Sequence, residues 1–69
     1  MFRYKIDVMK ELIAAGYNPA RIRKEKLLGE RTIQQIREGE VVGITSLERI
    51  CMMLHCQPGD LIEWVPDNE

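Results

Sequence analysis

The chain has 69 residues, of which 45% are hydrophobic and 30% are charged, and its formal net charge is −1. This length and composition are typical of one soluble globular domain and exclude a disordered tail. No apolar run approaches the roughly 20 residues of a membrane span, and the N-terminus lacks an apolar signal core, so we expect a cytoplasmic protein without membrane contact whose single domain covers residues 1–69.

The small net charge hides a division between the two halves of the chain. Residues 1–37 carry nine Lys or Arg side chains against four Asp or Glu, whereas residues 38–69 carry one against seven. A basic face can attract phosphate groups while the rest of a protein stays acidic, so this asymmetry indicates a negatively charged partner. The alternative is a basic helix surface that only contacts water.

Two helices are expected in the first 25 residues. The apolar residues of the first helix recur at helical spacing, and they are Ile6, Met9, Leu12 and Ile13. Gly16 marks the end of this helix. Asn18 followed by Pro19 is typical of a helix start, because asparagine accepts a hydrogen bond from a free backbone amide and proline suits the first helical position. The second helix therefore runs to about residue 25, and Ile22 is its one strongly apolar interior residue.

Residues 27–38 read LLGERTIQQIRE, and a third helix is predicted after the first three of them. The break between the second and third helices lies at residues 26–29, and Gly39 ends the third. Residues 39–44, which read GEVVGI, form a short loop punctuated by Gly39 and Gly43.

Two more helices follow the loop. Thr45 and Glu48 form a capping-box pattern that begins the fourth, whose apolar stripe is Leu47, Ile50, Cys51 and Leu54. Residues 57–61 predict a fifth short helix, with Pro58 at its first position and Gln57 as a weak cap. No stretch predicts a pair of strands. Five short helices with short connections predict an all-α fold, a compact five-helix orthogonal bundle.

The third helix carries polar groups on the side opposite its apolar residues. At about 100° per residue, Ile33 and Ile36 set the inward direction. Arg31 then points outward, flanked by Gln34 and Gln35. Arginine can bond guanine bidentately, glutamine can bond adenine in the same way, and a glutamate can accept a hydrogen bond from cytosine.

The second helix carries four cations suited to a phosphate backbone, namely Arg21, Arg23, Lys24 and Lys26. Two helices are joined here by a short turn, and the second carries polar groups that match base edges. This arrangement is typical of a helix-turn-helix, here at about residues 19–38. The alternative is that the adjacent glutamines are merely solvated surface.

The segment TIQQIREGE, followed by ITSLERICMMLHCQPGDLIEWVPD, resembles the Cro/CI-type (XRE-family) helix-turn-helix domains of bacteria and their phages. The resemblance covers nearly the whole chain. It implies a lambda-repressor-like fold and sequence-specific binding of double-stranded DNA by a small transcriptional regulator, a repressor that occupies its operator. It places base reading at Gly29, Glu30, Arg31 and Gln35, and phosphate contacts at Thr32, Gln34 and Arg37.

Two positions depart from the pattern of this family. Many members have glycine where Leu27 stands and serine or threonine where Gly29 stands. Leucine would be strained at a positive φ, and glycine offers no capping hydroxyl, so we expect the turn before the third helix to have a different geometry.

The two cysteines and the single histidine suggest no metal site. Cys51 and Cys56 are expected in one helix, roughly 140° apart around its axis, which suits a disulfide badly and predicts free thiols. Cys51 and His55 share a face, but no fourth ligand has suitable spacing. We therefore expect no metal, cofactor or small-molecule ligand, and no enzymatic activity.

A single recognition helix reads only a few base pairs. The resemblance therefore implies a homodimer, at least on DNA, and Met52, Trp64 and Val65 are the expected dimer contacts. The alternative function is a protein-binding module, antitoxin-like or antirepressor-like, which keeps the fold but engages a protein through its acidic second half.

Overall fold

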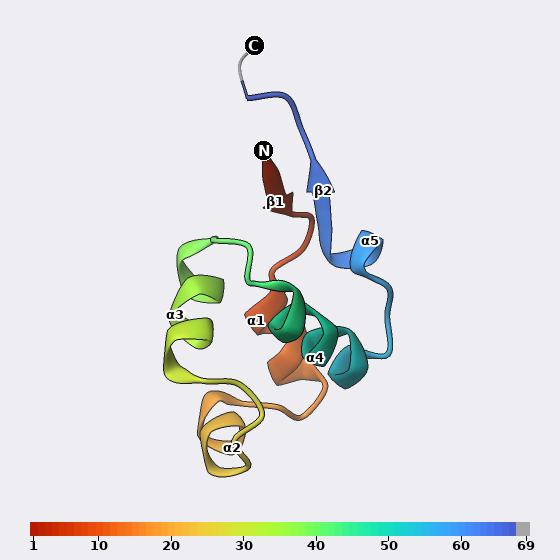
Figure 1. The fold of residues 1–69 in the computed structure, drawn as a ribbon. Helices are drawn as coiled ribbons and strands as arrows, with labels where there is room; N and C mark the ends of the chain where they lie inside the picture. Colours follow the sequence, from red (N-terminus) through yellow and green to blue (C-terminus); the bar gives the residue numbers. More distant parts are fainter. Residues whose placement is uncertain (68–69) are drawn as a thin grey trace.

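The computed structural model describes residues 1–67, which contain five helices and one two-stranded sheet (Figure 1). The helices are α1 (Val8–Ala14), α2 (Pro19–Lys24), α3 (Glu30–Glu38), α4 (Ile44–Leu54) and α5 (Pro58–Leu61), and the strands are β1 (Phe2–Tyr4) and β2 (Ile62–Trp64). The five predicted helices are therefore confirmed. Within residues 1–67 no helix has the length and apolar character needed to span a membrane.

The expectation that no strands pair was wrong. β1 and β2 pair antiparallel, with Phe2 opposite Trp64 and Tyr4 opposite Ile62. This ribbon projects from the helical part and carries the N-terminus (Figure 1). Three-residue strands are too short to show an alternating pattern, and their partners lie about 60 positions apart, so no local signal marked them.

Each helix contributes one side chain to the centre of the core. Five side chains are at most 1% exposed, and they are Leu12, Ile22, Ile33, Ile50 and Leu61. Burying such a side chain contributes about 1.5–3 kcal/mol, so one isoleucine is enough to anchor the short, otherwise polar α2. Six further apolar side chains complete the core, namely Val8, Leu28, Ile36, Val42, Leu47 and Met53.

Two helix starts differ from those predicted. Asp7 caps α1 by accepting a hydrogen bond from the Lys10 amide at 3.1 Å, so Ile6 lies before the helix and is exposed. Gly43, rather than Thr45, precedes α4 and makes no side-chain cap bond, so the predicted capping box was wrong. The start at Asn18 is confirmed, because its side chain accepts from the Arg21 amide at 2.8 Å.

Four helices end in the same six-residue arrangement, the Schellman motif, in which one residue adopts a left-handed conformation. These residues are Gly16, Lys26, Gly39 and His55, with φ values of 98°, 56°, 82° and 54°. In each motif the residue after the left-handed one donates its amide to the carbonyl oxygen five positions earlier. These bonds run from Tyr17 to Leu12 at 2.8 Å, from Leu27 to Ile22 at 3.0 Å, from Glu40 to Gln35 at 2.8 Å and from Cys56 to Cys51 at 3.0 Å. Below, the two residues that this bond joins are called the motif pair.

These endings explain how Leu27 is accommodated and correct the expectation that Cys51 and Cys56 share one helix. Lys26, and not Leu27, takes the left-handed conformation after α2, so Leu27 avoids strain and instead packs partly buried against the core. α4 ends at Leu54, and His55 turns the chain, so Cys51 and Cys56 do not share one helix.

Candidate nucleic-acid interface

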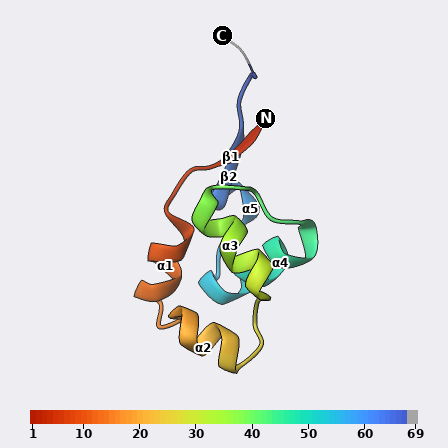
Figure 2. The same ribbon diagram turned by 90° about the vertical axis from the view of Figure 1, so that its left-hand side faces the viewer.

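The side of α3 that faces away from the core forms a polar surface. Ile33 and Ile36 are 1% and 6% exposed and face the core, whereas Arg31 and Gln34 are exposed. Figure 2 looks onto this side of the molecule, with α3 in front and α2 below it. The outward direction predicted for Arg31 agrees with this arrangement.

The first turn of α3 is tied to its neighbours through two side chains. The Arg23 guanidinium on α2 forms an ion pair with Glu30, which joins the two helices of the motif. Thr32 is half-buried, and its hydroxyl lies 3.4 Å from that of Ser46 on α4. Gly29 caps α3 without a side-chain bond, and a Cβ placed there would meet nothing within 4 Å. The start of α3 is therefore open at its backbone.

A contact that the sequence did not predict fixes the turn before α3. Arg49 on α4 donates from Nη1 to the carbonyl oxygen of Leu27 at 3.1 Å. The neighbouring Leu28 is 6% exposed and belongs to the core. The available signal was that Arg49 is the single cation of residues 38–69.

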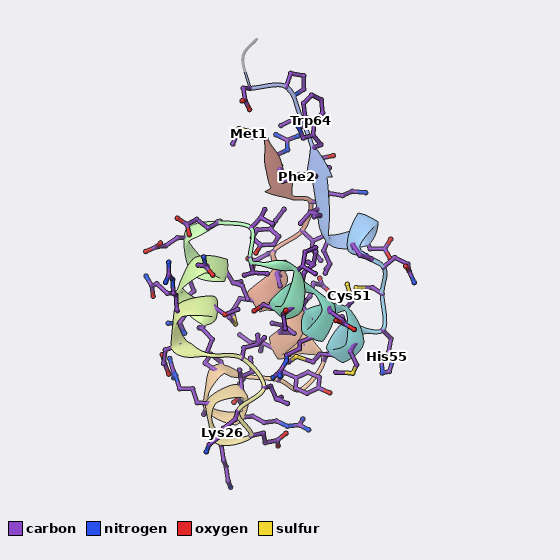
Figure 3. All side chains as sticks on the ribbon, in the orientation of Figure 1. Met1, Phe2, Lys26, Cys51, His55 and Trp64 are labelled. Atoms are coloured by element: carbon purple, nitrogen blue, oxygen red, sulfur yellow. The ribbon has the colours of Figure 1, made fainter. Side chains whose placement is uncertain are left out.

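The cations of α2 and its turn fall into two groups. Arg21 donates to Glu25 at 2.9 Å and to the Gly16 carbonyl at 3.0 Å, and its guanidinium lies 4.6 Å from the centre of the Tyr17 ring. Arg23 is held by Glu30. The other two side chains, Lys24 and Lys26, are exposed, and Figure 3 shows Lys26 at the outer end of the molecule beside α2.

Four predicted contact residues keep their cationic groups available. Within residues 1–67, no hydrogen bond or ion pair involves the side chains of Lys24, Lys26, Arg31 or Arg37. All four side chains are exposed. They are therefore free to meet phosphate or base acceptors without first losing an internal bond.

The two glutamines hold carboxylates of their own chain. Gln34 donates to Glu38 at 2.8 Å, and the half-buried Gln35 donates to Glu40 at 3.4 Å. These bonds are exposed to water, so their net contribution to stability is small, and exchanging them for a base edge costs little.

The predicted dimer residues lie on two separate parts of the molecule. Trp64 is 62% exposed on β2, opposite Phe2, which is 58% exposed. Figure 3 shows both side chains with Met1 on the projecting ribbon. Val65 is half-buried beside them and donates its amide to Met1 at 2.8 Å. Met52 is 66% exposed but belongs to α4.

The side chains that could bind a metal ion are dispersed in the described part of the chain. Across residues 1–67, no three His, Cys, Asp or Glu side chains gather as a metal ion requires. Both cysteines are free and half-buried.

Comparison with known proteins gives one match. A family model described as a Cro/C1-type HTH DNA-binding domain matches residues 7–67, which include all five helices and β2. No curated protein and no solved structure matches the chain. The matched range contains the α2–turn–α3 unit described above and leaves β1 outside. The chain belongs to the family of Cro/C1-type helix-turn-helix DNA-binding domains.

Proposed function

We propose that this protein is a transcriptional regulator that recognises one duplex DNA sequence by placing α3 in the major groove. The observation that carries the proposal is the outward face of α3, where Arg31 has no partner within residues 1–67 and lies opposite the buried Ile33 and Ile36. The major groove admits an α-helix. In a helix-turn-helix the N-terminal end of the second helix of the motif, here α3, enters the groove first.

Base reading is assigned to the start and middle of α3. Arg31 bonds guanine O6 and N7, and Gln35 exchanges Glu40 for adenine N6 and N7. Glu30 accepts from cytosine N4 once it parts from Arg23. Gly29 lets the backbone approach the bases, because no side chain stands between them.

Phosphate contacts are assigned around this helix, with different support for each. Lys24, Lys26 and Arg37 are exposed cations with no partner in the described residues. Arg23 joins them when DNA draws Glu30 away, and Arg21 keeps its internal bonds while its charge adds to the basic surface. Thr32 and Gln34 contact phosphates at the edges of the reading surface. These contacts set the register of the protein, while the base contacts select the sequence.

Binding in this way yields repression by occupancy of the operator. A helix held in the major groove excludes other proteins from the same base pairs. Two copies are needed for a site long enough to be selective, so the regulator binds as a homodimer on half-sites about one helical turn apart. The exposed aromatic pair Phe2 and Trp64 on the ribbon supports an interface there, since such side chains are enriched in the centres of interfaces.

Selection from a pool of random duplexes tests this function. The expected result is a short, two-fold symmetric sequence that is enriched over successive rounds. A pool that stays random, with no retention of any duplex at low salt, would contradict the proposal and would favour the protein-binding alternative.

A further inference from the structure

Cys51 and Cys56 are the motif pair at the end of α4. His55 between them adopts the left-handed conformation at a φ of 54°, and the Cys56 amide donates to the Cys51 carbonyl at 3.0 Å. A contact between the side chains of these two positions frequently accompanies a Schellman motif, and here Cys51 is among the groups that act on the Cys56 thiol. The two thiols are therefore neighbours, although four residues separate them in the sequence.

The same geometry recurs within this molecule and shows what it does to side chains. Gln35 and Glu40 are the motif pair at the end of α3, and their side chains lie 3.4 Å apart. At the end of α4, Cys51 and Cys56 both line one open groove, together with Leu47 and Pro58. Both thiols therefore face the same solvent-accessible space.

The surroundings of the pair also set its reactivity. Partial burial raises the pKa of the Cys56 thiol above its usual 9.0, and the neighbouring Cys51 raises it further. The thiolate is the nucleophile in disulfide exchange, so Cys56 reacts slowly at neutral pH and faster as the pH rises.

We propose that Cys51 and Cys56 form a reversible redox site that closes to an intramolecular disulfide by exchange with a low-molecular-weight disulfide such as oxidised glutathione. One cysteine thiolate attacks a sulfur of the small disulfide, forming a mixed disulfide and releasing one small thiolate. The second cysteine thiolate attacks the protein sulfur of that mixed disulfide and releases the other. Two S–H bonds are lost and one S–S bond forms in the protein, while the two protons and two electrons leave on the two small thiols.

The site is separate from the proposed DNA interface. Cys51 and His55 lie on the side of α4 away from α3 (Figure 3). The disulfide would close a loop of only a few residues where the backbone already turns. It would therefore cross-link α4 to the connection before α5 without moving α3. The oxidation state of the Cys51–Cys56 pair therefore follows that of the surrounding small thiols. The redox proposal does not depend on the proposed binding of DNA.

The test uses the full chain in glutathione buffers of increasing oxidised fraction at pH 8, followed by blocking of free thiols and mass spectrometry of the intact protein and its peptides. Wild type is expected to lose two hydrogen atoms and to give a linked Cys51–Cys56 peptide without bound glutathione. The matched control is the double variant Cys56→Ser/Gln57→Cys, which keeps two thiols but moves one out of the motif pair. We expect its internal disulfide to form at a yield lower by about tenfold, because the effective concentration of the second thiol falls.

Two further measurements test the formation of this disulfide if the double variant folds poorly. Single variants Cys51→Ser and Cys56→Ser must accumulate the glutathione adduct that wild type resolves. Oxidised wild type must melt higher than the reduced protein, by roughly 5 °C or more. Glutathione adducts on both wild-type cysteines, disulfides between chains, or a lower melting temperature after oxidation would each overturn the proposal.

Discussion

In the proposed function, recognition of the DNA sequence depends most on Arg31. Its side chain is exposed, and no bond within residues 1–67 competes for its donors. We predict that Arg31→Ala weakens binding to the selected duplex by about 1–3 kcal/mol, because a bidentate pair with guanine is lost. The loss should be confined to one base pair per half-site, which titration against single-substitution duplexes would reveal.

The effect of Gln35→Ala on DNA binding can be compared with that of Arg31→Ala. Because Gln35 must first release Glu40, Gln35→Ala should relax a neighbouring position by less than Arg31→Ala does. Both variants should have the melting temperature of wild type, since neither side chain belongs to the core. An equal loss of affinity for every sequence in Arg31→Ala would identify Arg31 as a phosphate contact instead.

Among the elements, α2 is expected to contact phosphates through Lys24 and to stabilise the fold through Arg21. We predict that Lys24→Ala lowers the salt dependence of binding by about one unit and weakens all sequences equally, because a phosphate contact is lost. Arg21→Ala should act mainly on stability, since it removes the bonds to Gly16 and Glu25 and the contact with Tyr17. Binding isotherms at several salt concentrations, with melting curves, separate the two effects. A changed sequence preference in Lys24→Ala would show that α2 reads bases.

A single hydroxyl joins the ribbon to the connection between α3 and α4. The Tyr4 hydroxyl donates to the Glu40 carbonyl at 2.8 Å and accepts from the Val42 amide at 3.2 Å. We predict that Tyr4→Phe lowers the free energy of unfolding by about 1 kcal/mol, because the partly buried Val42 amide and the exposed Glu40 carbonyl lose their partner. Urea unfolding at pH 7 measures this, and an unchanged midpoint would mean that water replaces the hydroxyl.

The same contact gives stability a pH dependence. Burial raises the pKa of Tyr4 above its ordinary value of 10.0, and the hydrogen bond from Val42 offsets part of that rise. The unfolded chain therefore ionises first as the pH climbs, so the contribution of Tyr4 is complete below about pH 10 and declines above it. Tyr4→Phe should lose less stability than wild type over that range.

The helices and the reading face could be predicted from sequence because their signals are local. Asn18 and Pro19 mark a start, Gly39 marks an end, and the spacing of Ile33 and Ile36 fixes the outward direction of Arg31. The site residues themselves stay predictions until DNA binding is measured.

What could not be predicted depends on contacts between distant residues or on unusual backbone choices. Lys26 and His55 adopt a conformation that glycine normally marks in a sequence, so neither the left-handed residue after α2 nor the end of α4 could be predicted. The ribbon and the bond from Arg49 to Leu27 join segments about 20 to 60 positions apart, which no local pattern records.

At the scale of the whole molecule, the ribbon makes the shape elongated, with extents of 41 × 22 × 20 Å. We predict that two copies occupy each selected duplex and that Trp64→Ala or Phe2→Ala weakens this assembly, because each removes a large exposed aromatic surface. Met52→Ala tests the other expected contact, on α4. Sedimentation of the protein–DNA complex measures the stoichiometry. One copy per selected duplex would refute the dimer, and an effect of Met52→Ala alone would move the interface to α4.

The central claim is that the outward face of α3 recognises a specific DNA sequence. The most direct measurement compares affinities for the selected duplex and a random duplex from about 50 to 200 mM salt. We predict that both affinities fall steeply with salt, because phosphates are neutralised, while the selected duplex stays bound more tightly by about 10³-fold or more. Equal affinity for the two duplexes, or no binding to either at low salt, would contradict it.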